Sequence, residues 1–302
     1  MNYEYRVDIR DNAILRASFN ELTRKTFGFD FISWYDQEHW GDNYIPHALV
    51  DHSGKVISNV SVNLMKFDVS GETKHYIQLG TVMTDPDYQG QGLNKYLIHR
   101  ILEEYQETVD GFYLFANDSV LNYYPKYGFK PVKEYEYSLL VEGKAMEKAG
   151  KYSIEKVSLS DQKACDKLYQ TIQFTDQENL GHNPNDRFAL YDNLSLIQFW
   201  LTAEYEDNVY YIPELKAYII AHIETDVLTV VQIFSQKKVD MVKLAASFGE
   251  EISKVKLCYT PKEKEVYHVK PHKIENSTLF ILGEDLYQME IKKMMFPEIS
   301  HA

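Results

Sequence analysis

The stretch TVMTDPDYQGQGLNKYLIHRILEEY, residues 81–105, constrains the fold of this chain more than any other segment. It passes from a β-branched run through Pro86 and two closely spaced glycines, Gly90 and Gly92, into a pattern with apolar residues at helical spacing. Backbone without Cβ atoms just before a helix leaves the unpaired N–H groups and partial positive charge of the helix N-terminus open. The stretch therefore predicts a strand, a turn suited to phosphate oxygens, and a helix.

Two well-known phosphate-binding loops do not match this stretch. A P-loop needs a Lys followed by Ser or Thr at a fixed distance after its first glycine, and none stands there. A dinucleotide-binding fingerprint needs a small residue three positions after Gly92, where Lys95 stands, and the preceding strands have the pattern of hairpins. Taken alone, a Gly-x-Gly pair more often marks a plain structural turn.

Hydrophobic patterning divides the chain into two halves with a similar order of predicted elements. For the first half it predicts helices over 11–26 and 93–105, an irregular aromatic segment or short helices over 27–46, a short helical piece over 119–127, and strands over 45–51, 55–69, 74–84, 111–116 and 129–141. For the second half it predicts helices over 160–172, 192–205 and 237–252, and strands over 153–159, 209–213, 216–224, 227–235, 254–260 and 277–283.

The charged, small-residue run 142–151 marks the seam between the halves. We therefore expect two α/β domains, each with a mixed sheet of the α+β kind, over 1–141 and 150–302. The similar lengths and element orders indicate an internal duplication. The second half has no glycine between its third strand and the helix that follows.

Composition excludes several classes of protein. The 302-residue chain has no apolar run long enough to cross a membrane and begins with charged residues, so we expect a soluble, cytoplasmic protein without membrane contact. Its net charge of −13 makes nucleic acid a poor partner and favours a cationic small molecule, although acidic surfaces also simply keep proteins soluble. Cys165 and Cys258 are expected to be two buried thiols. The sequence leaves both a monomer and a homo-oligomer open.

Two motifs resemble signatures of the GNAT family of N-acetyltransferases. The run TDPDYQGQGLNKYLI resembles motif A of the family, which has Gln or Arg, two residues, Gly, one residue, then Gly or Ala, after a turn like Pro-Asp-Tyr. Gln89 and Gly92 match, whereas Asn94 stands where Gly or Ala is usual. Downstream, Asn117 precedes Tyr124 by seven residues and Tyr124 precedes Gly-Phe by four, as in the second signature of the family.

The resemblance, over roughly residues 1–140, implies a fold, a cosubstrate and site residues. It implies a GNAT acyltransferase fold that binds acetyl-CoA, with a second GNAT-like domain that lacks the glycine loop and packs against the first as a degenerate copy. The pyrophosphate would lie on the amides of the loop, the pantetheine arm would pair with the preceding strand, and Asn117 would contact the arm. The implied cofactor-binding residues are thus Val82, Met83, Thr84, Gln89, Gly90, Gln91, Gly92, Leu93, Asn94 and Asn117.

The resemblance also suggests the chemistry. Tyr124 would be the general acid that protonates the departing thiolate, although it also fits one more amphipathic tyrosine among 24. A backbone N–H on the strand would stabilise the oxyanion. Candidates for the base are Glu38, His39 and His75, with a water relay also open. Histidine spacing indicates no metal site, and direct transfer in this family needs neither a metal nor a covalent acyl-enzyme.

The acceptor is predicted less directly. The acidic, aromatic segment 34–42 could hold a cation through carboxylates and ring faces, and it also fits an aromatic-anchored loop with solvated charges. The candidate substrate residues are Trp34, Asp36, Glu38 and His75. The leading hypothesis is an N-acetyltransferase that moves an acetyl group from acetyl-CoA to a primary amine of a small cationic molecule or peptide. The alternative is a non-catalytic acyl-CoA-binding sensor or scaffold.

Overall fold

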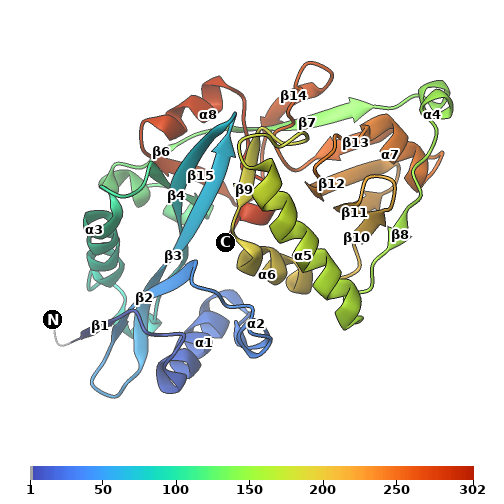
Figure 1. The fold of residues 1–302 in the computed structure, drawn as a ribbon. Coiled ribbons are helices and arrows are strands. Elements are labelled where there is room, and N and C mark those ends of the chain that lie inside the picture. Colours follow the sequence, from blue (N-terminus) through green and yellow to red (C-terminus); the bar gives the residue numbers. More distant parts are fainter. Residues whose placement is uncertain (1–2) are drawn as a thin grey trace.

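The computed structural model describes residues 3–302 and contains two mixed sheets flanked by helices (Figure 1). The first sheet has the order β1 (Glu4–Arg6), β2 (Tyr44–Val50), β3 (Val56–Val69), β4 (Glu72–Thr84), β5 (Gly111–Ala116), β15 (Thr278–Leu282) and β6 (Lys130–Pro131). A further short strand, β9 (Phe188–Tyr191), pairs with the far end of β3. Only β4 and β5 run parallel within this sheet, and its other pairs are antiparallel.

The second sheet repeats this arrangement. Its order is β8 (Glu155–Lys156), β10 (Val209–Ile212), β11 (Ala217–Glu224), β12 (Val227–Phe234), β13 (Lys254–Leu257), β7 (Glu134–Leu140) and β14 (His268–His272). Here β12 and β13 form the parallel pair. Because β12 and β13 occupy the places of β4 and β5, the halves share one topology, and the prediction of a mixed α/β fold in each half is confirmed.

The two sheets exchange one strand each. Strand β7 belongs to the first half by sequence but lies between β13 and β14 of the second sheet. Strand β15 belongs to the second half but lies between β5 and β6 of the first sheet. The predicted single strand over 129–141 is therefore wrong in detail, because β6 and β7 from this segment pair in different sheets.

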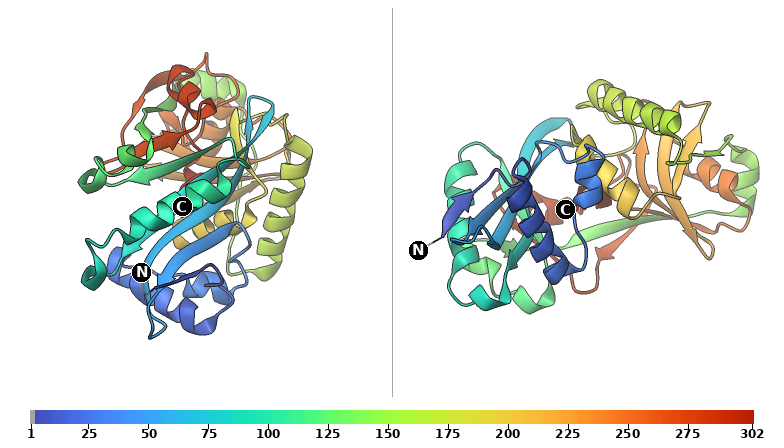
Figure 2. Two further views of the ribbon diagram at one scale, coloured as in Figure 1. Left: turned by 90° about the vertical axis from the view of Figure 1, so that its left-hand side faces the viewer. Right: turned by 90° about the horizontal axis from the view of Figure 1, so that it is seen from below.

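Helices cover both faces of each sheet (Figure 2). On the first sheet, α1 (Ala13–Phe27) and α2 (Ile32–Asp36) lie on one face and α3 (Leu93–Tyr105) on the other. On the second sheet, α5 (Gln162–Asn179) and α6 (Leu194–Ala203) pack on one face, with α4 (Gly143–Ala149) and α7 (Met241–Phe248) on the other. The segment 142–151, predicted to be the seam between the halves, thus contains a helix whose Met146 is buried against the second sheet.

Several local predictions are confirmed. Helix α1 falls within the predicted range 11–26, and its N-cap is Asn12, whose side chain accepts from the amides of Ile14 and Leu15. The aromatic segment after it contains a short helix, α2. Both cysteines are free and buried. In the described part of the chain, every helix is too short or too polar to cross a membrane.

An aromatic cluster joins the two halves. Phe67 on β3, Tyr113 on β5, Phe188 on β9 and Phe296 pack together, and the rings of Tyr113 and Phe296 stack with centroids 4.0 Å apart. Phe296 follows α8 (Gln288–Ile291), so the end of the chain enters the core between the sheets. Figures 1 and 2 show the C-terminal end between the two sheets, whereas the N-terminal end lies at the outer edge of the first.

Candidate functional site: a forked sheet with an open helix end

The parallel strands β4 and β5 part at the centre of the first sheet. They pair only from Tyr76 with Gly111 to Gln78 with Tyr113. Beyond this point β4 continues to Thr84 and pairs only with β3. The edge of β4 that faces β5 is therefore left without a strand partner over 79–84, and its backbone groups are available to an extended ligand.

Val82, Met83 and Thr84 lie on this free edge. The Met83 side chain is buried with the α1 cluster, and the half-buried Val82 packs with the α3 cluster. Alternate side chains thus anchor β4 to both faces. The three residues predicted to bind the pantetheine arm are brought together on one accessible backbone edge.

Glycines open the N-terminus of α3. Gly90 and Gly92 have φ of +75° and +76°, in the left-handed region that other residues rarely adopt, and a Cβ built on either would meet no protein atom within 4 Å. Their backbone conformation, rather than crowding by the protein, is what requires glycine. Gly92 is the N-cap of α3 and supplies no side-chain cap.

The backbone N–H groups of the glycine loop and the first turn of α3 make no hydrogen bonds within the described residues. From Gly90 to Lys95, no backbone N–H donates a hydrogen bond to any residue among 3–302. Gln89, Gly90, Gln91 and Gly92 are exposed, and Leu93 anchors the helix in the core. A helix of 13 residues with open amides at its N-terminus favours an anion such as a pyrophosphate.

Asn94, which departs from the family pattern, is turned toward the sheet. Its Oδ1 accepts from Ser58 Oγ at 2.6 Å, and Ser58 also contacts Thr84 Oγ1 at 3.0 Å. The Asn94 side chain therefore ties the first turn of α3 to β3 and the end of β4. A ligand at the amides would meet the backbone of the loop, with the Asn94 oxygen held away by Ser58.

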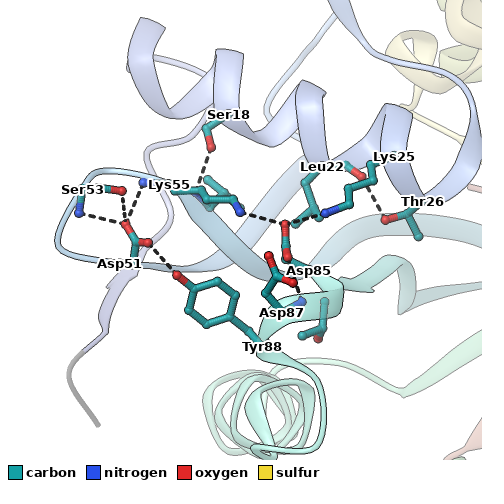
Figure 3. Close-up of polar contacts among 12 residues, drawn as sticks. Ser18, Leu22, Lys25, Thr26, Asp51, Ser53, Lys55, Asp85, Asp87 and Tyr88 are labelled. Atoms are coloured by element: carbon teal, nitrogen blue, oxygen red, sulfur yellow. Dashed lines mark hydrogen bonds and ion pairs between the residues drawn. The ribbon is translucent and has the colours of Figure 1, made fainter.

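Ion pairs centred on the buried Asp85 fix the turn that leads into the glycines (Figure 3). Asp85 is 2% exposed, and its Oδ2 lies 2.9 Å from Lys55 Nζ and 3.2 Å from Lys25 Nζ. Its Oδ1 accepts from the Asp87 amide. Burial alone would raise the pKa of Asp85, but the bonds from Lys55, the Asp87 amide and Lys25 outweigh it and lower the pKa. Charged Asp85 thus holds the end of β4 to α1 and β3.

A second tie holds the same turn. Tyr88 donates its hydroxyl to Asp51 Oδ2 at 2.9 Å, as Figure 3 shows. Asp51 lies in the turn between β2 and β3, where its other oxygen accepts from Ser53 and the Lys55 amide. The segment between β4 and the glycine loop is therefore pre-organised by contacts on both sides.

Tyr124 lies in the core on the α3 side of the first sheet rather than on the surface. It is 5% exposed and packs against Phe129 and against Phe280 of the exchanged strand β15. Burial raises its pKa above the ordinary value near 10, so the phenol is protonated at neutral pH. Asn117 is exposed just after β5, on the other arm of the fork. The roles of both residues stay predictions.

The structure separates the candidate substrate residues. Trp34 is buried among aromatic rings, and its Nε1 donates to the Ser195 carbonyl oxygen of the second half. Asp36 and Glu38 are exposed, and Asp36 lines a shallow hollow with Asp30 and Ser33. His75 is exposed nine residues before Thr84, about 30 Å away along β4.

The structure thus keeps three of the four candidates near α2 and places His75 at the opposite end of β4. His39, the further candidate base, has a pKa lowered by burial, and its ring packs edge-on against Tyr169 of α5. Glu38 and His39 directly follow α2, so they lie where the first half meets the second.

Hydrophobic patterning did not identify the contacts that the segment 300–302 makes beside the fork. Gln78 Nε2 donates to the Ala302 carbonyl oxygen at 3.0 Å, and Tyr113 donates to the Ser300 carbonyl oxygen at 3.1 Å. A Cβ on Gly80 would lie 2.9 Å from that Ala302 oxygen, so only glycine fits there beside the segment 300–302. Such contacts span more than 180 residues of sequence and leave no local signal.

The second half lacks an open helix end at the equivalent place. The Asp240 side chain caps α7 by accepting from the amides of Val242 and Lys243, so a carboxylate occupies the position that an anion would need. A cavity of about 450 Å³ lies there, lined by residues that include Lys238, Asp240 and Tyr259. The prediction that the second copy has no glycine loop is confirmed.

Within residues 3–302, no group of three or more His, Cys, Asp or Glu side chains is placed to hold a metal ion. The fork and the loop instead offer backbone amides, which suit a phosphate-bearing ligand with an extended arm. A mixed sheet that forks beside a glycine-opened helix is consistent with the class of protein that the sequence resembles, the acyl-CoA-dependent acyltransferases.

Comparison with known proteins agrees with that class. A family model described as an acetyltransferase (GNAT) domain matches residues 12–132, so the N-terminal part of the chain is a GNAT acetyltransferase domain. A search of curated proteins found no match.

Solved structures resemble the whole chain. A probable N-acyltransferase from Enterococcus faecalis V583 has a TM-score of 0.60 at 15% identity, over 96% of this chain and 75% of that one. A GCN5-related N-acetyltransferase from Kribbella flavida gives 0.58 at 13% identity, over 93% and 71%. Eis1 from Mycobacterium abscessus gives 0.56 at 10% identity, over 92% and 72%. At these identities the likeness concerns the fold, and it is consistent with tandem GNAT-like domains.

Proposed function

We propose that the protein is an N-acetyltransferase that transfers the acetyl group of acetyl-CoA to a primary amine of a small cationic molecule or peptide. One observation carries the proposal most directly. The open amides behind Gly90 and Gly92 adjoin the unpaired edge of β4, so a pyrophosphate and an extended arm can bind side by side. Acetyl-CoA has both parts and supplies the acetyl thioester.

The residues of this chain would then act in sequence. The amides from Gly90 to Asn94 hold the pyrophosphate, and the backbone of Val82 and Met83 aligns the arm. A β4 amide donates to the carbonyl oxygen as the amine nitrogen attacks the thioester carbon. When the carbon–sulfur bond breaks, Tyr124 gives its phenolic proton to the thiolate and regains a proton that the amine loses.

The acceptor proposal rests on charge and position. Asp36 and Glu38 are exposed and unpaired within the described residues, at the edge of the aromatic cluster that contains Trp34. Two carboxylates beside rings attract a cationic group. Because Trp34 bonds to Ser195, the second half forms one wall of this region, which supports the proposal that it helps to shape the acceptor site.

A non-catalytic acyl-CoA-binding module is the alternative. It is favoured by the strand before the glycine loop, which offers His75 and Gln78 where members of the family that the sequence resembles often carry a Glu. Gln78 is a neutral amide that cannot accept a proton at neutral pH, and its Nε2 already donates to the Ala302 carbonyl oxygen.

Release of free CoA across a panel of amines separates the two functions. We expect turnover with a cationic primary amine, and we expect Tyr124→Phe to lower kcat by about 100-fold while acetyl-CoA binding is kept. Tyr123→Phe is the matched control, because Tyr123 is the half-buried neighbour and its loss should leave kcat near the parent value. Acetyl-CoA binding without turnover on any amine would instead support the module.

A further inference from the structure

Strand β4 contains a bulge at the fork. Asn59 pairs with Met83 and Ser61 pairs with Gly80, so Thr81 and Val82 together oppose the single residue Val60. Thr81 has a φ of +47°, a left-handed conformation that is unusual for any residue but glycine and a marked outlier for a β-branched one. Such backbone persists only where the surrounding structure enforces it.

A closed circuit of hydrogen bonds enforces it here. Asn59 Nδ2 donates to the Thr81 carbonyl oxygen and to Ser61 Oγ, both at 2.9 Å. Ser61 Oγ donates to the Tyr44 hydroxyl at 2.9 Å, and this hydroxyl lies 2.7 Å from Thr81 Oγ1. Both ends of Thr81, its carbonyl and its side chain, are therefore fixed by one network of three residues.

Tyr44 is the rigid member of this network. It is 7% exposed, and its ring packs against Phe31, Trp34 and Trp40 with centroids 5.2 to 5.5 Å away. The hydroxyl therefore cannot follow Thr81 if the strand moves. Asn59 and Ser61 are fully buried on β3, which makes the circuit a feature of the folded sheet rather than of the surface.

We infer that Tyr44 is a positioning residue for the acetyl-transfer step, an inference that rests on the proposed function. Through Thr81 it holds the bulge that turns the backbone of Val82 at the fork, where the thioester oxygen of acetyl-CoA would lie. Preorganised backbone donors stabilise developing charge in the transition state more than they stabilise the bound substrate. Loosening the bulge should therefore lower kcat and leave the binding of acetyl-CoA at the glycine loop almost unchanged.

The test compares variants that remove single hydroxyls. Tyr44→Phe keeps the packed ring, and Thr81→Val keeps the shape of the side chain. We expect each to lower kcat by about tenfold or more with the KM for acetyl-CoA within about twofold. The double variant should lose no more than Tyr44→Phe alone, because Tyr44→Phe already removes the hydrogen bond between Tyr44 and Thr81. Thr81→Ser, which keeps the hydroxyl, should restore kcat.

Tyr191→Phe is the matched control for stability. Tyr191 is a buried tyrosine on β9 whose hydroxyl donates to the Asn179 carbonyl oxygen, outside the fork. It should lower the melting temperature about as much as Tyr44→Phe but leave kcat unchanged. A readout without turnover is amide hydrogen exchange over residues 81–84, which should be faster in Tyr44→Phe than in the parent or in Tyr191→Phe.

The outcomes distinguish this inference from the proposed function. An active parent whose kcat survives Tyr44→Phe, or falls equally with Tyr191→Phe, overturns the positioning role and leaves the acetyltransferase standing. A parent that transfers no acetyl group overturns the proposed function and with it the catalytic role of Tyr44. In that case faster exchange over 81–84 would still support, and unchanged exchange would contradict, the claim that Tyr44 holds the bulge.

Discussion

At the residue scale, single buried polar groups hold the irregular parts of this molecule. Asp85 fixes the turn before the glycine loop, and Tyr44 fixes the bulge in β4. Glu134, on the exchanged strand β7, is a third case. It is 6% exposed, and its Oε1 accepts from the Phe296 amide, which ties β7 to the segment that enters the core between the sheets.

Glu134 gives a prediction with a defined pH window. Burial raises its pKa from 4.5 to about 7, only partly offset by the bond from the Phe296 amide. At a pH between these two pKa values, the unfolded chain releases a proton that the folded chain keeps. The free energy of unfolding therefore falls as pH rises through this range, by about 3 kcal/mol in all. Glu134→Gln keeps the acceptor oxygen and removes the ionisable group. It should therefore melt at a higher temperature than the parent at pH 8, and its melting temperature should depend less on pH.

Glu136 on the same strand serves as the control of opposite sign. Burial alone would raise its pKa, but hydrogen bonds from Lys270 and His272 outweigh burial and lower it. Its contribution to stability is present above its unfolded pKa and is lost as pH falls. Glu136→Gln should therefore destabilise the protein at pH 8. If the melting temperatures of the two variants changed with pH in the same way between pH 4 and 8, the opposite pKa shifts assigned to Glu134 and Glu136 would be contradicted.

At the element scale, α3 and α7 differ in how their N-termini are capped. Helix α3 follows β4 and α7 follows β12, which are the fourth strands, counted from the outer edge, of two sheets with the same topology. Gly92 starts α3 without a side-chain cap, whereas the Asp240 carboxylate caps α7. Whether each helix N-terminus is open could be predicted from the sequence, because glycines act locally, through backbone conformation and the lack of a capping side chain.

Other elements could not be predicted because their partners are distant in sequence. Alternation over 129–141 indicates strand, but it carries no information on which sheet each part joins, and β6 and β7 join different sheets. Strand β9 has only four residues, and the sequence pattern predicts no strand there. The open turn at Gly90 and Gly92 was predicted from local sequence. The contact of Gln78 with Ala302 was not, because it depends on the folding of the whole chain.

At the scale of the whole molecule, the exchange of β7 and β15 makes the halves interdependent. Each sheet would lose one strand and expose a bare edge if the other half were absent. The aromatic cluster that contains Phe67, Tyr113 and Phe296 would also be divided. The division of the chain into domains 1–141 and 150–302 stays a prediction of the sequence.

A protease site inserted after Gly150 tests this interdependence. Gly150 is exposed at the end of α4, so cleavage there should leave the fragments together on size-exclusion chromatography, with the native circular dichroism spectrum kept. Each fragment expressed alone should be largely unfolded or aggregated. A first fragment that is monomeric and folded by itself would show that β15 is dispensable for the first sheet.

The central claim is that the glycines open α3 to the pyrophosphate of acetyl-CoA, and calorimetric titration with acetyl-CoA tests it most directly. Gly92→Glu places a carboxylate at the open amides, and Gly28→Glu is the matched control, because Gly28 is also exposed, has a φ of +82° and has no atom near its Cβ position. We predict one acetyl-CoA per chain, lost in Gly92→Glu and kept in Gly28→Glu. No binding by the parent, or equal binding by both variants, would contradict the account.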